Sequence, residues 1–116
     1  MTNIIYENNI MRFAGYGWAH GQRRSTYDEQ GASHIKSWGL QNKAENFIIR
    51  NNILDTSRYD LFEIDAGGGA QYLPEVDGNT YIQMRNGRAG YWGNTRLNFD
   101  ERQIKTMDRN AIVISY

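Results

Sequence analysis

Cysteine is absent from this chain, and proline occurs only once among its 116 residues. The lack of cysteine excludes a disulfide-stapled scaffold and any metal site built on thiolates. No apolar run approaches the roughly 18 residues of a membrane-spanning helix, so no membrane partner is expected. Lys+Arg and Asp+Glu are equal at 13 each, and nucleic acid is therefore not favoured as a partner. The first residues, MTNIIYENN, lack the basic and apolar regions of a signal peptide.

What the chain does contain favours short strands joined by tight turns. Glycine occurs 12 times and tyrosine 8 times, and asparagine is abundant, whereas the helix formers leucine and alanine are scarce. Its length suits a single domain with a modest core. Only 101–109 is compatible with a short turn of helix.

A motif is written twice in this sequence. NIIYENNIMR (3–12) and NFIIRNNILD (46–55) align at a shift of 43 residues, which superimposes Asn9 on Asn52. Each copy has an apolar run, an asparagine pair and a second apolar run. Because asparagine tolerates the left-handed backbone conformation, the pair predicts a sharp bend between two strands. Other short strands are expected at 34–38, 61–65, 80–84, 96–99 and 111–116.

This strand–asparagine–strand repeat resembles that of right-handed parallel β-helix proteins of the pectate-lyase-like kind. The resemblance implies an all-β solenoid of few coils, each with three short parallel strands, and long loops at 14–33 and 66–79. It also implies that Asn9 and Asn52 stack in a ladder of side-chain amides. The alternative is a small antiparallel β-sandwich in which the duplication is coincidental.

The domain organisation follows from the same resemblance. The chain is expected to be one β-helix domain or fragment over 1–116, with repeat units near 3–13 and 46–56. The repeat fades after 86, and about 85–116 is expected to close the fold with a last strand, AIVISY, that covers the core. The N-terminal strand has no cap, and an uncapped solenoid end exposes apolar core and strand edges. A missing stretch of helix or a second copy of the chain, giving a homodimer, is expected to cover it.

Strand alternation predicts a polar outer face on the two strands at 34–38 and 61–65. If these strands stack about 4.8 Å apart, the face carries His34, Lys36, Trp38, Glu63 and Asp65. Glu63 and Asp65 suit the paired carboxylates of glycoside hydrolysis. His34 and Lys36 suit proton abstraction beside a uronate carboxyl, for which cations must stabilise the carboxylate. These four are the candidate catalytic residues.

The candidate substrate-binding residues are mostly in the first long loop: Trp18, His20, Arg23, Arg24 and Trp38. Plainer interpretations compete with each assignment. Lys36 beside Glu63 suits a cross-strand ion pair on a wet face, and His34 a surface or turn position. The arginine pair suits solvated loop charge, and the two tryptophans suit packing.

The resemblance implies a secreted or cell-surface glycoside hydrolase or polysaccharide lyase, of which this chain forms the C-terminal coils. The alternative is a non-catalytic glycan-binding or structural module of the adhesin or tail-spike type, because an enzyme of this kind has more coils. The expected partner is a polysaccharide or oligosaccharide in either case. No cofactor is expected, and no metal site, since the two histidines lie 14 residues apart without a clear ligand set.

Overall fold

The computed structural model describes residues 2–14, 33–37, 45–65, 73–93 and 95–116. These residues are mostly β-strand, so the all-β prediction is confirmed. The first three strands are β1 (Thr2–Glu7), β2 (Ile10–Ala14) and β3 (Ile35–Ser37). The next three are β4 (Glu45–Arg50), β5 (Ile53–Ser57) and β6 (Phe62–Ile64). A third set follows, with β7 (Glu75–Asp77), β8 (Thr80–Gln83) and β9 (Arg88–Trp92). The chain ends with β10 (Thr95–Asn98), a short helix α3 (Glu101–Ile104) and β11 (Ile112–Ser115).

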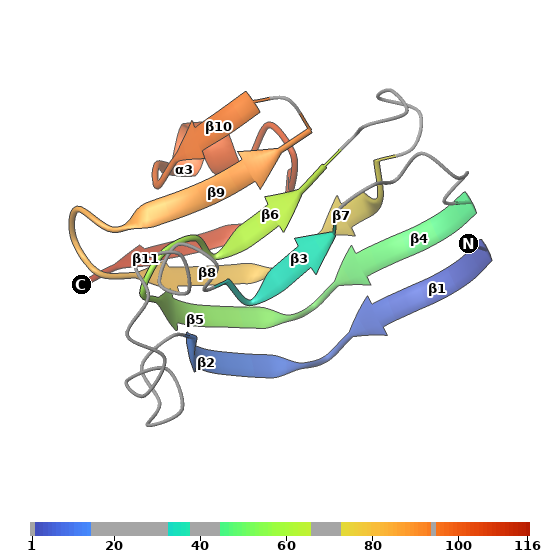
Figure 1. Ribbon diagram of the computed structural model, residues 1–116, viewed down its shortest axis with the longest axis horizontal. Coiled ribbons are helices and arrows are strands. Elements are labelled where there is room, and N and C mark those ends of the chain that lie inside the picture. Colours follow the sequence, from blue (N-terminus) through green and yellow to red (C-terminus); the bar gives the residue numbers. More distant parts are fainter. Residues whose placement is uncertain (1, 15–32, 38–44, 66–72, 94) are drawn as a thin grey trace, which may run out of the picture.

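Each set of three strands, called a unit here, contributes one strand to each of three sheets (Figure 1). Sheet A has the order β1-β4-β7, sheet B β11-β8-β5-β2 and sheet C β10-β9-β6-β3. All the described strand pairs are parallel except β9 with β10. Strands of successive units therefore lie side by side, and the antiparallel sandwich is ruled out.

The bends between the first and second strand of each unit come from left-handed residues. Asn8, Asn51 and Gly78 have φ values of 60°, 55° and 70°. Only glycine and asparagine adopt this conformation without a large steric penalty, which explains the residue types at these positions. Because the bend is the same in each unit, β1 and β2 keep one register with β4 and β5, pairing Ile5 with Ile48 and Ile10 with Ile53.

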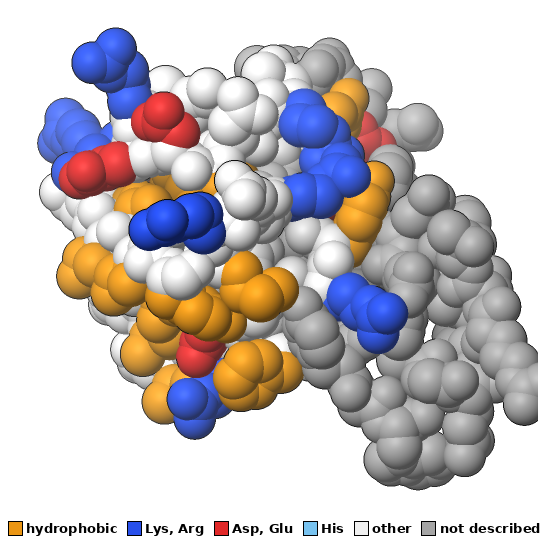
Figure 2. Space-filling model, turned by 90° about the vertical axis from the view of Figure 1, so that its left-hand side faces the viewer, with side chains coloured by type: hydrophobic (Ala, Val, Ile, Leu, Met, Phe, Trp, Pro, Cys, Tyr) orange, Lys and Arg blue, Asp and Glu red, His pale blue; other side chains and the backbone are white. Residues whose placement is uncertain are grey.

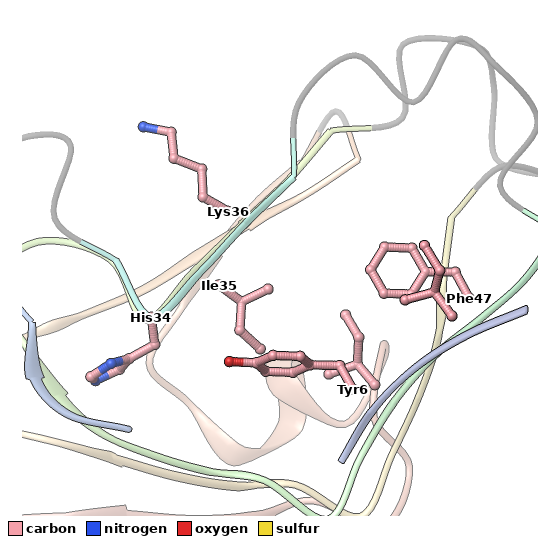
Figure 3. Close-up of a pocket in the computed structure, with 7 residues that line it drawn as sticks. Tyr6, His34, Ile35, Lys36 and Phe47 are labelled. Atoms are coloured by element: carbon pink, nitrogen blue, oxygen red, sulfur yellow. The ribbon is translucent and has the colours of Figure 1, made fainter. Parts of the chain in front are cut away.

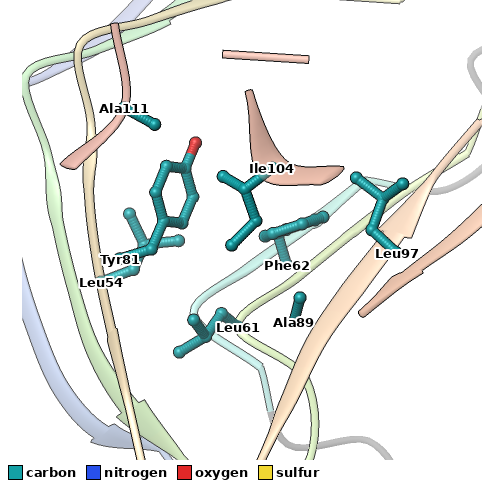
Figure 4. Close-up of a cluster of buried hydrophobic side chains, with 8 residues drawn as sticks. All are labelled: Leu54, Leu61, Phe62, Tyr81, Ala89, Leu97, Ile104 and Ala111. Carbon is teal, nitrogen blue, oxygen red and sulfur yellow. The ribbon is translucent and has the colours of Figure 1, made fainter. Parts of the chain in front are cut away.

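The main core lies between sheets B and C, where inward side chains of successive strands stack (Figure 4). The ring of Phe62 meets that of Tyr81 edge-on, with centroids 5.8 Å apart. Helix α3 closes this core, because its Ile104 is fully buried against it. The buried members are Leu54, Leu61, Phe62, Tyr81, Ala89, Leu97, Ile104 and Ala111.

The C-terminal third departs from the sequence-based expectations. β7 lies within 66–79, which was expected to be a loop. β11 continues sheet B beside β8, and Ala111 and Val113 of the expected closing strand pack on the main core, while Ile112 and Ile114 face outward and are 56% and 45% exposed. The short helix α3, through Ile104, closes the core together with this strand. Figure 2 shows that exposed hydrophobic side chains gather on one face of the molecule, next to Lys and Arg side chains.

Candidate functional site

A row of polar and aromatic side chains crosses the four strands of sheet C. The strand register pairs Lys36 of β3 with Glu63 of β6, Glu63 with Tyr91 of β9, and Tyr91 with Arg96 of β10. These residues alternate with the buried Phe62 and so occupy the opposite, outer face of the sheet. Lys36 Nζ lies 3.1 Å from Glu63 Oε2. The sequence predicted this neighbourhood of Lys36 and Glu63, and the structure brings the two together.

Asp60, in the bend before β6, binds two arginine side chains at the other end of the row. Its Oδ1 accepts hydrogen bonds from Arg96 Nη1 at 2.9 Å and Arg88 Nε at 3.2 Å. The Asp60 side chain is completely buried, whereas the two arginine side chains are 43% and 41% exposed. The Arg88 guanidinium also stacks on the ring of Tyr59, 3.9 Å from its centroid. The two arginine side chains are thereby held in place while part of each remains exposed to solvent.

Glu63 lies near the buried carboxyl group of Asp60, and its pKa is raised. Burial raises the pKa of Glu63, and a hydrogen bond to the Asp60 carboxylate raises it further, while Lys36 acts in the opposite direction. A raised pKa means that the site favours the neutral form of the Glu63 carboxyl group more than water does.

A polar groove of about 570 Å³ lies next to the arginines. Three cationic side chains line it, Arg85, Arg88 and Arg96, together with Asn86, Asn98 and the ring of Phe99. Guanidinium and amide groups donate hydrogen bonds to hydroxyl, carboxylate and sulfate oxygens. The groove and the row share Arg96, so the two form one continuous polar surface.

His34 does not belong to this row, in contrast to the expected shared face. Its Nε2 lies 3.1 Å from the carbonyl oxygen of Asp55 and 3.0 Å from that of Thr56, so Nε2 carries a proton and donates it. Figure 3 shows His34 and Lys36 pointing away from each other. Burial lowers the pKa of His34, although the two carbonyls and the Asp55 charge oppose the shift. The ring ties β3 to β5.

The other predicted site residues are placed as follows. Asp65 comes directly after β6 and is partly buried. Trp18, His20, Arg23, Arg24 and Trp38 lie outside the described residues. Sequence reasoning missed Asp60, Arg88, Tyr91 and Arg96. A parallel register of 88–92 on β6 would have placed Tyr91 beside Glu63, but the repeat fades after 86 and gives no such register.

Asn9 and Asn52 lie one above the other, and the ladder they start continues beyond them. Asn9 Nδ2 donates to Asn52 Oδ1 at 3.0 Å, and Asn52 Nδ2 donates to Asn79 Oδ1 at 3.0 Å. Asn79 Nδ2 then donates to Asp108 Oδ2, also at 3.0 Å. Asn79 follows Asn52 by 27 residues, whereas Asn52 follows Asn9 by 43. That change of spacing concealed Asn79, although DGNT (77–80) has the same turn chemistry as RNNI (50–53).

No family model, curated protein or solved structure matches this chain. Among the described residues, no three His, Asp or Glu side chains are grouped to hold a metal ion. In the same part of the chain, no helix has the length and apolar character needed to cross a membrane.

Proposed function

We propose that this chain is part of a right-handed parallel β-helix protein of the carbohydrate-processing class, and that sheet C binds a polysaccharide. The β-helix proposal is supported by the rotation of successive strands among three sheets with parallel pairing. The amide ladder supports it as well. The proposed class carries the expectation of a secreted or cell-surface protein.

The row Lys36–Glu63–Tyr91–Arg96 is the observation on which the binding proposal rests. Its strands place these side chains about 4.8 Å apart, so the row is as wide as a short oligosaccharide. The Arg96 guanidinium lies 5.8 Å from the centroid of the Tyr91 ring. An aromatic ring beside fixed cations and carboxyls provides a stacking surface and hydrogen-bonding groups for a sugar. The three arginines of the groove favour a chain that carries acidic groups.

Binding fits this geometry better than elimination. Lys36 Nζ lies 3.1 Å from Glu63 Oε2, so the Lys36 side chain is held against a carboxyl group of the sheet. His34 donates from Nε2 to main-chain carbonyls away from the row. Asp60 is completely buried and accepts hydrogen bonds from Arg88 and Arg96, so it is not available as a second carboxylate for a sugar.

Hydrolysis remains a second candidate because of one observation. Glu63 has a raised pKa, as a general acid requires, and Asp65 lies two residues further along, about 6.6 Å away for strand geometry. Release of reducing ends from a panel of polysaccharides, compared between the native chain and Glu63→Gln, tests this candidate. Equal release by both proteins would exclude Glu63 as the acid.

The binding proposal is tested by affinity electrophoresis in gels containing acidic or neutral polysaccharides. We expect the native chain to be retarded by an acidic polysaccharide, and Tyr91→Leu and Arg96→Gln to lose most of that retardation. Arg12→Gln on sheet B is the matched control, because it removes an exposed arginine that also pairs with a carboxylate. Loss of retardation in all three variants, or in none, would contradict the assignment to sheet C.

A further inference from the structure

The end of the molecule formed by β1, β2 and β3 presents uncovered interior. Tyr6 pairs in register with Ile49, yet Tyr6 is 37% exposed and Ile49 only 2%. Inside this end lies a pocket of about 360 Å³ lined mainly by apolar side chains, among them Ile4, Tyr6, Ile35 and Phe47 (Figure 3). Among the described residues, no strand pairs with the free edge of β1 or β2. This end therefore has the surface of an unfinished stack.

The hydrogen bonds of the amide ladder all run in one direction. The backbone N–H and the side-chain Nδ2 of Asn9 both donate to Asn52 Oδ1, at 3.0 Å each. Asn52 repeats the pattern with Asn79 Oδ1, at 2.9 and 3.0 Å. The ladder stops at Asp108, whose carboxylate can only accept. At the opposite end, no described residue donates to Asn9 Oδ1, so within the described part of the chain the ladder begins with an acceptor that has no donor.

Asn9 Nδ2 makes a second hydrogen bond, and this bond also differs from its counterparts in the later units. In the later units this bond reaches back to the preceding unit, from Asn52 to the carbonyl of Tyr6 at 2.9 Å and from Asn79 to that of Ile49 at 3.1 Å. Asn9 instead donates to the carbonyl of Glu7, two residues before it in its own unit, at 3.1 Å. At Asn9 a carbonyl of the same unit thus takes the place of the carbonyl that the preceding unit supplies to Asn52 and Asn79.

Charged residues before and after the bend at Asn8 also indicate which segment could pair with the free edges of β1 and β2. Glu7 pairs in register with Arg50, with Oε2 and Nε 2.6 Å apart, and Arg12 pairs with Asp55 at 3.2 Å. In the first of these rows the sign alternates over three units, because Asp77 pairs in register with Arg50. A segment placed on the free side would therefore need a basic residue opposite Glu7 and an acidic one opposite Arg12.

We propose that the free edges of β1 and β2 bind a strand–turn–strand segment of a partner polypeptide in parallel register. The segment has a basic residue, then an asparagine two positions later, then an acidic residue three positions after the asparagine. Its asparagine donates from N and Nδ2 to Asn9 Oδ1, and its carbonyl, three residues earlier, accepts from Asn9 Nδ2. Residues 50–55 of this chain, RNNILD, show the required order.

A second copy of this chain does not meet these requirements. Placed head to head, it presents the same acceptor, Asn9 Oδ1. Placed head to tail, it presents Asp108, whose carboxylate has no N–H to donate. The occupant is therefore a polypeptide segment that carries its own asparagine turn.

The test uses the full chain with a copy of residues 45–57 joined to its N-terminus by about 20 Gly and Ser residues, which span about 25 Å. Such a tether gives the copy a millimolar effective concentration. In the structure, Ile53 N donates to the carbonyl of Asn9 at 2.8 Å, so Ile10 N–H is the group that a bound copy would protect. We expect hydrogen exchange at Ile10 to slow about tenfold, with a higher urea midpoint.

Two matched fusions give the test its specificity. One carries Asn52→Asp in the appended copy only, which removes the amide donor, and the other carries Arg50→Glu with Asp55→Arg in that copy. Both should return exchange at Ile10 to the rate of a scrambled copy. Equal protection by all fusions, or none by any, would overturn the proposal. Light scattering of the unmodified chain that shows a dimer with Ile10 already protected would also overturn it, in favour of a second copy.

Discussion

Asn79 donates a side-chain N–H to Oδ2 of Asp108 at 3.0 Å, so a ladder of neutral amides ends on a carboxylate. Asp108 also accepts from the backbone N–H of Gly78 at 2.7 Å, from that of Asn79 at 2.9 Å and from the Tyr81 hydroxyl at 3.0 Å. Asp108 is completely buried, and these donors surround it. One acidic side chain thereby joins the bend of the third unit to the segment between α3 and β11.

Asn52→Ala should lower the free energy of unfolding by about 1–3 kcal/mol, because buried donors and acceptors on both sides of Asn52 lose their partner. Asn52 is 1% exposed. Asn98→Ala, at an exposed position of β10, is the control and should change stability by less than about 0.5 kcal/mol. Urea unfolding measures both, and equal losses would argue against the ladder as a stabilising element.

Asp108→Ala should be more damaging than Asn52→Ala, with a loss of about 3 kcal/mol or more, because several buried donors lose one acceptor together. Asp108→Asn keeps an acceptor oxygen and should lose clearly less. The order of the two urea midpoints is the measurement. Indistinguishable midpoints would mean that the carboxylate oxygens are not the stabilising acceptors.

Gly90→Ala should disrupt the pairing of β9 with β6, in which Gly90 lies opposite Phe62. A Cβ at this position would lie 2.0 Å from the carbonyl oxygen of Phe62, which is main chain and cannot move aside. We expect a loss of about 3 kcal/mol or more, or failure to fold. Thr95→Ala on β10, where the side chain is exposed, should be nearly neutral. Thermal melts of the two variants decide, and a fully stable Gly90→Ala protein would contradict this register.

Glu63 should make stability depend on pH in a defined direction. Its folded pKa is above the ordinary 4.5, so its contribution is fully present below pH 4.5 and is lost as pH rises through the folded value. Glu63→Gln keeps a neutral side chain and should gain stability over the native chain at pH 7, with a smaller difference near pH 4. Urea midpoints across this range test the sign. A difference that does not vary with pH would refute the raised pKa.

His34 should show the opposite pH dependence. Its folded pKa lies below the ordinary 6.5, so the stability it contributes is present above pH 6.5 and is lost as pH falls toward the folded value. The chain has two histidines, and His20→Gln leaves His34 as the only imidazole signal in an NMR titration. A midpoint at or above 6.5 would contradict the buried, carbonyl-bound ring.

The candidate site was only partly visible in the sequence. Period-two alternation on HIKSW and LFEID was enough to pair Lys36 with Glu63, because alternation is a local property of a strand. It failed for His34, which precedes the first residue of β3 and turns to the carbonyls of β5. Asp60 and Arg96 are 36 residues apart in the chain, and nothing local predicts their contact.

By itself, the sequence determined most of the strands, the left-handed bends at Asn8 and Asn51 and the pairing of the first two units, since these depend on residue type and on a repeat at a constant shift. Only the tertiary structure decided that Asn79 and Asp108 complete the ladder and that β9 and β10 extend sheet C. These two features depend on which strands become neighbours, and the loops that connect those strands differ in length. Loop length costs little conformational free energy, so it varies freely and removes the constant period by which distant partners could be found.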